Sequence, residues 1–302
     1  METYPTTILL ATDGSPDAVL AEQIATDLQT RSAADLHLVH AWQPITVGRD
    51  PLSGIAPEES YRLFRADAEA TLAASADRIA RAGGRVSGRH LRLGPPAREI
   101  VALSGELGAD LAILGSRGLG PVRRLVLGSV SEAVAHDARC PTLIVRNGAA
   151  AWPPARIIAG DDGSADATRA ASLGLALARL YGAALTLARA VPEEPDPPWY
   201  DAARRAALAR LHDDATARAR DAVAEHAYRL IGEGGRVPDV VVTKGDPAAL
   251  LLELAEARPE PTLIAVGCRG LGPLGRLRLG SVSTTIIHAA RGPILIVPHQ
   301  SG

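Results

Sequence analysis

The feature that most constrains the fold of this chain is an internal duplication. Residues 115–131 read GSRGLGPVRRLVLGSVS and residues 267–283 read GCRGLGPLGRLRLGSVS, so thirteen of seventeen positions are identical at an offset of 267 − 115 = 152 residues. A repeat of this length indicates two complete domains and excludes a solenoid of short units.

Other matched segments occur in the same order in both halves. They include ILLATDGSPDA with IIAGDDGSADA, and CPTLIVR with GPILIVP. We predict one domain over residues 1–148 and a second over residues 154–302. The small-residue and proline stretch at residues 147–155 has the composition of a linker.

The composition permits an aliphatic core in each half and argues against several classes of protein. Of the 302 residues, 47% are hydrophobic and only 3% aromatic, and the net charge of −2 argues against a nucleic-acid-binding protein. No apolar run is long enough to cross a bilayer, and the N-terminal residues resemble a first strand more than a signal peptide. Two cysteines without a CxxC pair favour the reducing cytoplasm over a disulfide framework.

Short aliphatic runs alternate with segments of helical spacing in each half. This alternation predicts an α/β fold, in which five parallel strands per half are covered by helices on both faces. In the first half, the strands are expected near residues 6–12, 35–42, 87–93, 110–115 and 141–146.

The glycine-rich segment after the fourth strand is the strongest candidate for a binding site. Ligands of open α/β sheets lie beyond the carboxyl ends of the strands. Glycines free this loop to direct backbone N–H groups at an anion, and the following helix adds its unpaired amides and its dipole. With hydroxyl groups at Ser129 and Ser131, repeated at Ser281 and Ser283, the segment predicts a phosphate site in each half.

Structural readings of the same residues remain open. Ser129 with Glu132 also fits a helix capping box, although Thr284 replaces the glutamate in the second half. Asp13 and Asp162 suit either a ribose, base or Mg²⁺ contact or a helix N-cap. The arginines of the loop suit either phosphates or solvent.

Two cysteines and a pair of histidines receive weaker assignments. Cys140 is expected in the core, whereas Cys268 lies in the glycine loop and is expected to be accessible. His136 and His288 lack a second histidine at metal-ligand spacing, so we interpret both as ordinary helix residues.

The loop is not a Walker A motif, because Leu127 and Leu279 stand where that motif requires lysine. Rapid phosphoryl transfer would therefore lack its usual cation. A slow ATPase or an adenylating enzyme of related fold stays as the alternative to a nucleotide-binding regulator, and a scaffold with vestigial sites is a third possibility.

The spacing Gly115-x2-Gly118-x9-Gly128-Ser129, repeated from Gly267, resembles the G-2x-G-9x-G-(S/T) signature of ATP-binding universal stress proteins. The resemblance covers nearly the whole chain and is greatest to the tandem proteins of actinobacteria. It implies Rossmann-like, flavodoxin-type domains with strand order 3-2-1-4-5. It also implies that the protein binds ATP, with or without Mg²⁺, and that this binding serves stress adaptation or growth control.

The resemblance further implies that strand 5 of each half, residues 142–145 and 294–297, mediates pairing between the domains or between two copies. One departure from the pattern is that Ala188 and Arg189 stand where the first half has Val39 and His40. Arg189 suits either a contact with the ligand or crowding of it, so the second site is less secure than the first.

The implied adenine contacts are Ala11, Asp13, Ala41, Gly160, Asp162 and Ala190. The phosphate contacts predicted in the first half are Gly115, Ser116, Arg117, Gly118, Leu119, Gly120, Pro121, Gly128, Ser129, Val130 and Ser131. Those predicted in the second half are Gly267, Cys268, Arg269, Gly270, Leu271, Gly272, Pro273, Gly280, Ser281, Val282 and Ser283.

Overall fold

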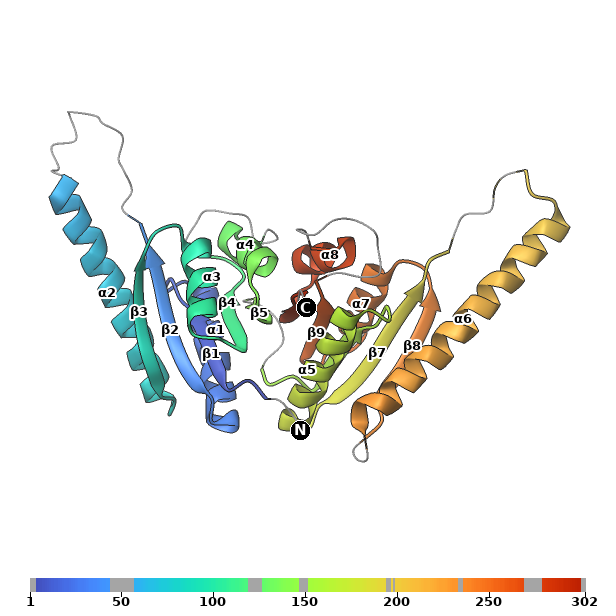
Figure 1. Cartoon of the computed structure of the whole chain (residues 1–302), viewed down its shortest axis with the longest axis horizontal. Helices are drawn as coiled ribbons and strands as arrows, with labels where there is room; N and C mark the ends of the chain where they lie inside the picture. The colour runs from blue at the N-terminus through green and yellow to red at the C-terminus, as the bar shows by residue number, and fades with distance from the viewer. Residues whose placement is uncertain are drawn as a thin grey trace. The chain divides into compact units, whose positions relative to one another are not determined.

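The structure is a computed structural model that describes residues 4–43, 57–118, 127–146, 152–193, 197, 199–232, 236–268 and 279–299. The chain divides into two compact units, one of residues 5–147 and one that contains residues 148–302. Figure 1 shows that both units have the same kind of layered architecture, in which helices flank a sheet.

The first unit alternates strands and helices along its whole length. Its elements are β1 (Thr7–Ala11), α1 (Pro16–Ser32), β2 (Asp35–Trp42), α2 (Pro57–Arg81), β3 (Val86–Leu93), α3 (Pro96–Glu106), β4 (Leu111–Gly115), α4 (Ser129–Asp137) and β5 (Thr142–Val145). The strands are parallel and follow the order β3-β2-β1-β4-β5.

The second unit repeats this succession of elements. They are β6 (Arg156–Gly160), α5 (Ala165–Tyr181), β7 (Ala184–Val191), α6 (Ala202–Ile231), β8 (Asp239–Lys244), α7 (Pro247–Glu256), β9 (Thr262–Gly267), α8 (Ser281–Ala289) and β10 (Ile294–Val297). Its parallel strands follow the order β8-β7-β6-β9-β10. The predicted α/β class, the five parallel strands per half and the order 3-2-1-4-5 are therefore confirmed within each unit.

Local sequence explains why these elements form. The inner strands β1 and β9 are buried almost throughout because helices cover both faces of the sheet. Ser15 and Ser164 cap the helices that follow β1 and β6, since their side chains accept the amides of Ala18 and Ala167. In the first unit α1 contacts α2 and α3 contacts α4, and right-handed crossovers place these two pairs on opposite faces of the sheet.

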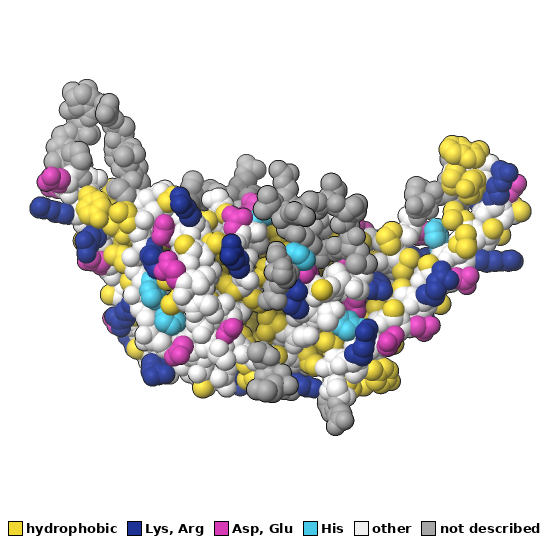
Figure 2. All heavy atoms as spheres, in the orientation of Figure 1, with side chains coloured by type: hydrophobic (Ala, Val, Ile, Leu, Met, Phe, Trp, Pro, Cys, Tyr) yellow, Lys and Arg dark blue, Asp and Glu magenta, His cyan; other side chains and the backbone are white. Residues whose placement is uncertain are grey.

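Two long helices are buried only along part of their length. In α2 the apolar residues Ala68, Leu72, Ala76 and Ile79, spaced three or four apart, are buried, whereas Tyr61 near the beginning of the helix is 38% exposed. Figure 2 shows charged side chains along much of α6 and hydrophobic ones near its beginning. None of the helices in the described part of the chain has the length and apolar character needed to cross a membrane.

Candidate functional site

The predicted site residues lie at the carboxyl ends of the strands. Ala11, Ala41, Gly160 and Ala190 lie at or near the ends of β1, β2, β6 and β7. Gly115 and Gly267 end β4 and β9, next to the central strands β1 and β6. The structure thus brings the first-strand, second-strand and glycine-loop residues of each unit to one edge of its sheet.

The glycine that ends the fourth strand is required by packing. A Cβ atom on Gly115 would lie 2.7 Å from the carbonyl carbon of Asp17 and 2.8 Å from the amide nitrogen of Ala18. On Gly267 it would lie 2.8 Å and 2.9 Å from the same atoms of Asp166 and Ala167. Carbon atoms in contact are normally about 3.5–4.0 Å apart, so the close approach of α1 and α5 explains both glycines without a ligand.

Backbone hydrogen bonds close the glycine loop at its base. The amide of Ser116 donates to Val145 at 2.6 Å, and the amide of Gly128 donates back to Ser116 at 2.7 Å. The second unit repeats both bonds, from Cys268 to Val297 at 2.8 Å and from Gly280 to Cys268 at 2.7 Å. The two ends of each loop are therefore held together, and the following helix begins beside the end of β4 or β9.

The second serine of the loop anchors this arrangement. The Ser131 hydroxyl donates to the carbonyl of Gly115 at 2.7 Å, and the Ser283 hydroxyl donates to that of Gly267 at 2.6 Å. Both serines are buried. Because a hydroxyl has one hydrogen to donate, these two side chains hold the helix to the strand and do not offer that hydrogen to a phosphate.

The beginnings of α4 and α8 keep the features of an anion site. Gly128 and Gly280 are the N-cap residues, and no side chain caps either helix. Ser129 is the first helical residue and not the N-cap, so the alternative of a capping box built on Ser129 is wrong. The first amides of such a helix have no intrahelical partner and favour negative charge.

Asp13 meets the glycine loop in the first unit. Its Oδ1 accepts the amide of Ser15 at 3.0 Å, while a Cβ on Gly118 would overlap its Oδ2. Asp162 accepts the amide of Ser164 at 2.9 Å in the same way. Because Ser15 and Ser164 are the N-caps, the alternative that these aspartates cap the helices is wrong.

A protein-only magnesium site is not formed at these aspartates. No group of three or more His, Cys, Asp or Glu side chains within the described ranges is arranged to hold a metal ion. The predicted Mg²⁺ would therefore need oxygen ligands from a phosphate chain in addition to one carboxylate.

Arg117 is paired within the first unit. Its Nε and Nη2 lie 3.2 Å and 3.3 Å from the carboxylate of Asp17, which is buried and also accepts the hydroxyl of Ser116 at 2.7 Å. The carbonyl of Arg117 accepts the Ser15 hydroxyl at 3.0 Å. The guanidinium therefore neutralises a buried acid and also lies at the start of the glycine loop.

The second unit holds the equivalent acid differently. Cys268 replaces Ser116, and its thiol lies 3.7 Å from Asp166 Oδ2. Arg169 and His299 bind the other oxygen of Asp166 at 2.8 Å and 3.1 Å. Cys268 is buried, so the expectation that it is accessible was wrong, because the predicted loop position did not reveal its packing against α5. Cys140 is buried as expected, and burial raises the pKa of its thiol.

The ends of the second strands also differ between the units. His40 donates from Nδ1 to the carbonyl of Thr12 at 2.7 Å. Arg189 takes the corresponding place, where its Nε donates to the carbonyl of Asp161 at 2.7 Å and its Nη2 to Asp161 Oδ1 at 3.1 Å. His226 donates to the other carboxylate oxygen at 2.6 Å. Sequence reasoning missed Asp161 and His226, although the mismatch of Thr12 with Asp161 in the aligned repeats was a usable signal.

Several predicted residues lie outside the described part of the chain. They are Leu119, Gly120 and Pro121 in the first half, and Arg269, Gly270, Leu271, Gly272 and Pro273 in the second.

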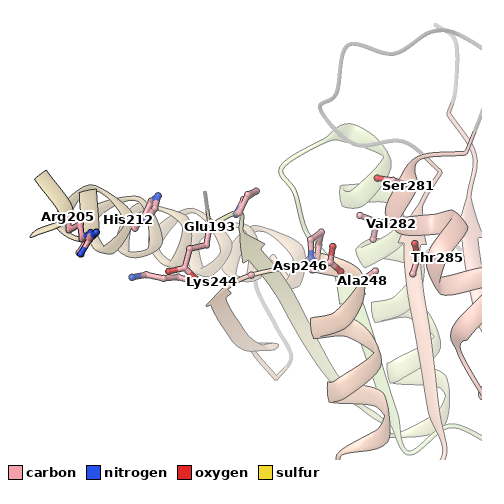
Figure 3. Close-up of a pocket in the computed structure, with 13 residues that line it drawn as sticks. Glu193, Arg205, His212, Lys244, Asp246, Ala248, Ser281, Val282 and Thr285 are labelled. Atoms are coloured by element: carbon pink, nitrogen blue, oxygen red, sulfur yellow. The ribbon is translucent and has the colours of Figure 1, made fainter. Parts of the chain in front are cut away.

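A cavity of about 890 Å³ lies at the carboxyl edge of the second unit. Figure 3 shows Ser281, Val282 and Thr285 of α8 along one side and Arg205 and His212 of α6 along the other, with Lys244 and Asp246 between them. The exposed beginning of α8 therefore lines a space large enough for a small organic ligand.

Doubly wound domains in tandem, each with an uncapped helix beginning beside a glycine loop, define a class of two-domain α/β proteins with candidate anion sites. The sequence matches the universal stress protein family over residues 5–146 and 155–298. The chain belongs to this family.

Individual relatives agree with this assignment. Universal stress protein Rv2005c of Mycobacterium tuberculosis is 32% identical over 208 residues, which are 67% of this chain and 65% of that relative. A universal stress protein of Mycolicibacterium smegmatis is 26% identical over 96% of both chains. The crystal structure of a universal stress protein from Archaeoglobus fulgidus matches 98% of this chain and 99% of its own with a TM-score of 0.69 at 21% identity, which supports the fold alone.

Proposed function

We propose that the chain is a stress-response regulator that binds ATP at one site per domain. In this proposal nucleotide occupancy controls conformation or partner binding during stress adaptation or growth control, and turnover is at most weak. The proposal places the protein in the cytoplasm, as its cysteine usage predicts.

One observation carries the proposal: in both units a helix without a side-chain cap begins at the base of the glycine loop. Both α4 and α8 begin at an uncapped glycine whose amide is tied back to the end of β4 or β9. Fixed amides of this kind bind phosphate without reorganisation. Asp13 faces Gly118 across the first loop, which puts a carboxylate within reach of the sugar of a nucleotide.

The direct test is the nucleotide content and affinity of the purified protein. We expect denaturation to release adenine nucleotide, and we expect calorimetry of the emptied protein to show two ATP sites. Gly118→Glu should abolish one of them, because its carboxylate would meet Asp13 and repel phosphate.

A matched control is Gly105→Glu, which introduces the same charge at an exposed helix position with open space around it. It should keep both sites. The proposal would be refuted if the emptied wild-type protein showed no binding of ATP at millimolar concentration. Hydrolysis in Mg²⁺ well above one turnover per minute would instead favour the enzymatic alternative.

A further inference from the structure

The two domains differ in the side chains that lie beside the candidate site. We call these side chains the wall of the site: Trp42, Tyr61 and Leu93 in the first unit, and Arg205, His212 and Lys244 in the second. The last pairs of the β2–β3 and β7–β8 ladders are Trp42 with Leu93 and Val191 with Lys244. The residue after each last pair makes the same hydrogen bond in both units: the amide of Gly94 donates to the carbonyl of Trp42 at 2.9 Å, and the amide of Gly245 donates to that of Val191 at 3.0 Å. Leu93 and Lys244, the only lysine of the chain, therefore occupy equivalent positions.

The long helices show the same difference. Ser75 of α2 contacts Thr12, and His226 of α6 contacts Asp161, which follow β1 and β6 directly. Tyr61 and His212 each precede these anchors by the same number of residues (75 − 61 = 226 − 212 = 14). His212 therefore stands where the first unit has Tyr61.

The wall of the first unit is apolar. The rings of Trp42 and Tyr61 are in contact, with centroids 5.2 Å apart, and Leu93 is 51% exposed. Figure 2 shows hydrophobic side chains near the beginning of α2. Arg65 lies beside Tyr61 but is paired with Glu69 at 2.9 Å, so among the described residues the positions equivalent to His212 and Lys244 are apolar or aromatic.

The wall of the second unit is cationic at the end of the cavity remote from α8. Arg205, His212 and Lys244 line that end. Arg205 is exposed and forms no ion pair with a residue in the described ranges. Lys244 Nζ lies 2.8 Å from Asp213, but both side chains are partly exposed, at 32% and 71%. Such surface pairs contribute little stability and are readily exchanged for another anion.

Two acidic side chains also line the cavity and set a limit on its charge. Asp246 caps α7 by accepting the amide of Ala249 at 2.8 Å, so the helix compensates its charge. Glu193 is exposed and lies near Lys244. The carboxylate of Glu193 therefore repels an anion at this end of the cavity, so its removal should strengthen anion binding where removal of Lys244 weakens it.

We propose that the second domain prefers a nucleotide whose sugar carries an anionic group in addition to the 5′-phosphate chain, and that Lys244, Arg205 and His212 contact this group. This inference rests on the proposed function. The 5′-phosphate lies on the first amides of α8, and the additional group reaches the cationic wall across the cavity. The first domain has Leu93 and Tyr61 at the positions of Lys244 and His212, so we expect it to distinguish such a ligand from an ordinary mononucleotide less well.

Two probes that differ by one group test the proposal, namely AMP and adenosine 3′,5′-bisphosphate. Calorimetry on the Gly118→Glu protein measures the second site alone. We expect the bisphosphate to bind about five- to tenfold more tightly than AMP, as charge-assisted contacts with partly exposed groups provide. Lys244→Leu, which installs the first-domain residue, should remove most of this preference, and Glu193→Gln should increase it.

Leu93→Lys is the matched control, because it adds the same charge at the equivalent position of the first unit. It should leave the preference of the second site unchanged. Equal affinity for both probes, or a preference that survives Lys244→Leu combined with Arg205→Ala, would overturn the inference while nucleotide binding stands. Failure of the second site to bind either probe while it binds ATP would overturn this inference alone, whereas failure to bind ATP as well would overturn the proposed function of the second site.

Discussion

Replacing Gly115 by alanine tests whether packing or a ligand requires the glycine that ends β4. The added methyl would meet the backbone of Asp17 and Ala18 at 2.7–2.8 Å, so β4 and α1 must separate by roughly 0.7–1 Å to reach ordinary contact. Overpacking of this kind costs about 1–3 kcal/mol. No flexible side-chain end can yield instead, because two of the three nearest atoms belong to the backbone and the third is the Asp17 Cβ.

The stability of the first domain can be measured separately from that of the second. Trp42 is 8% exposed and lies in the first unit, whereas Trp152 and Trp199 lie in the second. Trp152→Phe and Trp199→Phe therefore leave Trp42 as the fluorescence reporter for urea unfolding. We expect Gly115→Ala to lower the free energy of unfolding of this domain by about 1–3 kcal/mol without added nucleotide.

Gly105→Ala is the control for the loss of a glycine. Gly105 lies in α3 with open space around it, so alanine should be neutral or stabilise the domain by up to about 1 kcal/mol. If Gly115→Ala unfolds at the same urea concentration as its parent while Gly105→Ala behaves as expected, the packing argument is wrong. A ligand would then be the better reason for glycine at that position.

Three further predictions concern single side chains. Ser131→Ala should destabilise the first domain by about 1–2 kcal/mol, since it removes a buried hydrogen bond to the strand; an unchanged urea midpoint would argue against the anchor. Burial and the neighbouring His37 lower the pKa of His90 from its ordinary value of 6.5. His90 therefore binds a proton less readily in the folded domain than in the unfolded chain. The stability that neutral His90 contributes is fully present above pH 6.5 and should be lost as the pH falls through the lowered pKa. His90→Val, which installs the residue of the second domain, should weaken the dependence of the free energy of unfolding on pH. If the variant and its parent show the same pH dependence, His90 is not its cause. Arg189→His should destabilise the second domain by about 2–4 kcal/mol because Asp161 stays buried with one partner fewer. Adding Asp161→Thr should recover much of this loss, and additive losses would contradict the pairing.

Much of the fold was predictable because its determinants are local and repeated. The alternation of aliphatic strands and helical segments specified parallel sheets, and the duplicated glycine segment specified two equivalent loops. The positions of β1 to β5 agree with the predicted strands to within a residue or so. Helix beginnings at Ser15 and Ser164 follow from capping chemistry that acts over three residues.

The roles of individual site residues were less predictable. Ser131 and Cys268 had the residue types expected of a hydroxyl donor and an exposed thiol, but tertiary contacts bury both. Arg189 had the charge of a ligand contact but binds Asp161 instead. In each case the partner is distant in the sequence, and sequence spacing alone does not show which distant groups meet.

The sequence by itself therefore determined that this chain has two α/β domains of one family, with a glycine loop at the same place in each. Only the tertiary structure decided which of those glycines make room for a helix, which hydroxyls are already bonded, and how the walls beside the two sites differ. The physical reason is that periodicity and capping depend on near neighbours, whereas burial and hydrogen-bond partners at the edge of a sheet depend on segments about a hundred residues apart, as with Ser116 and Asp17.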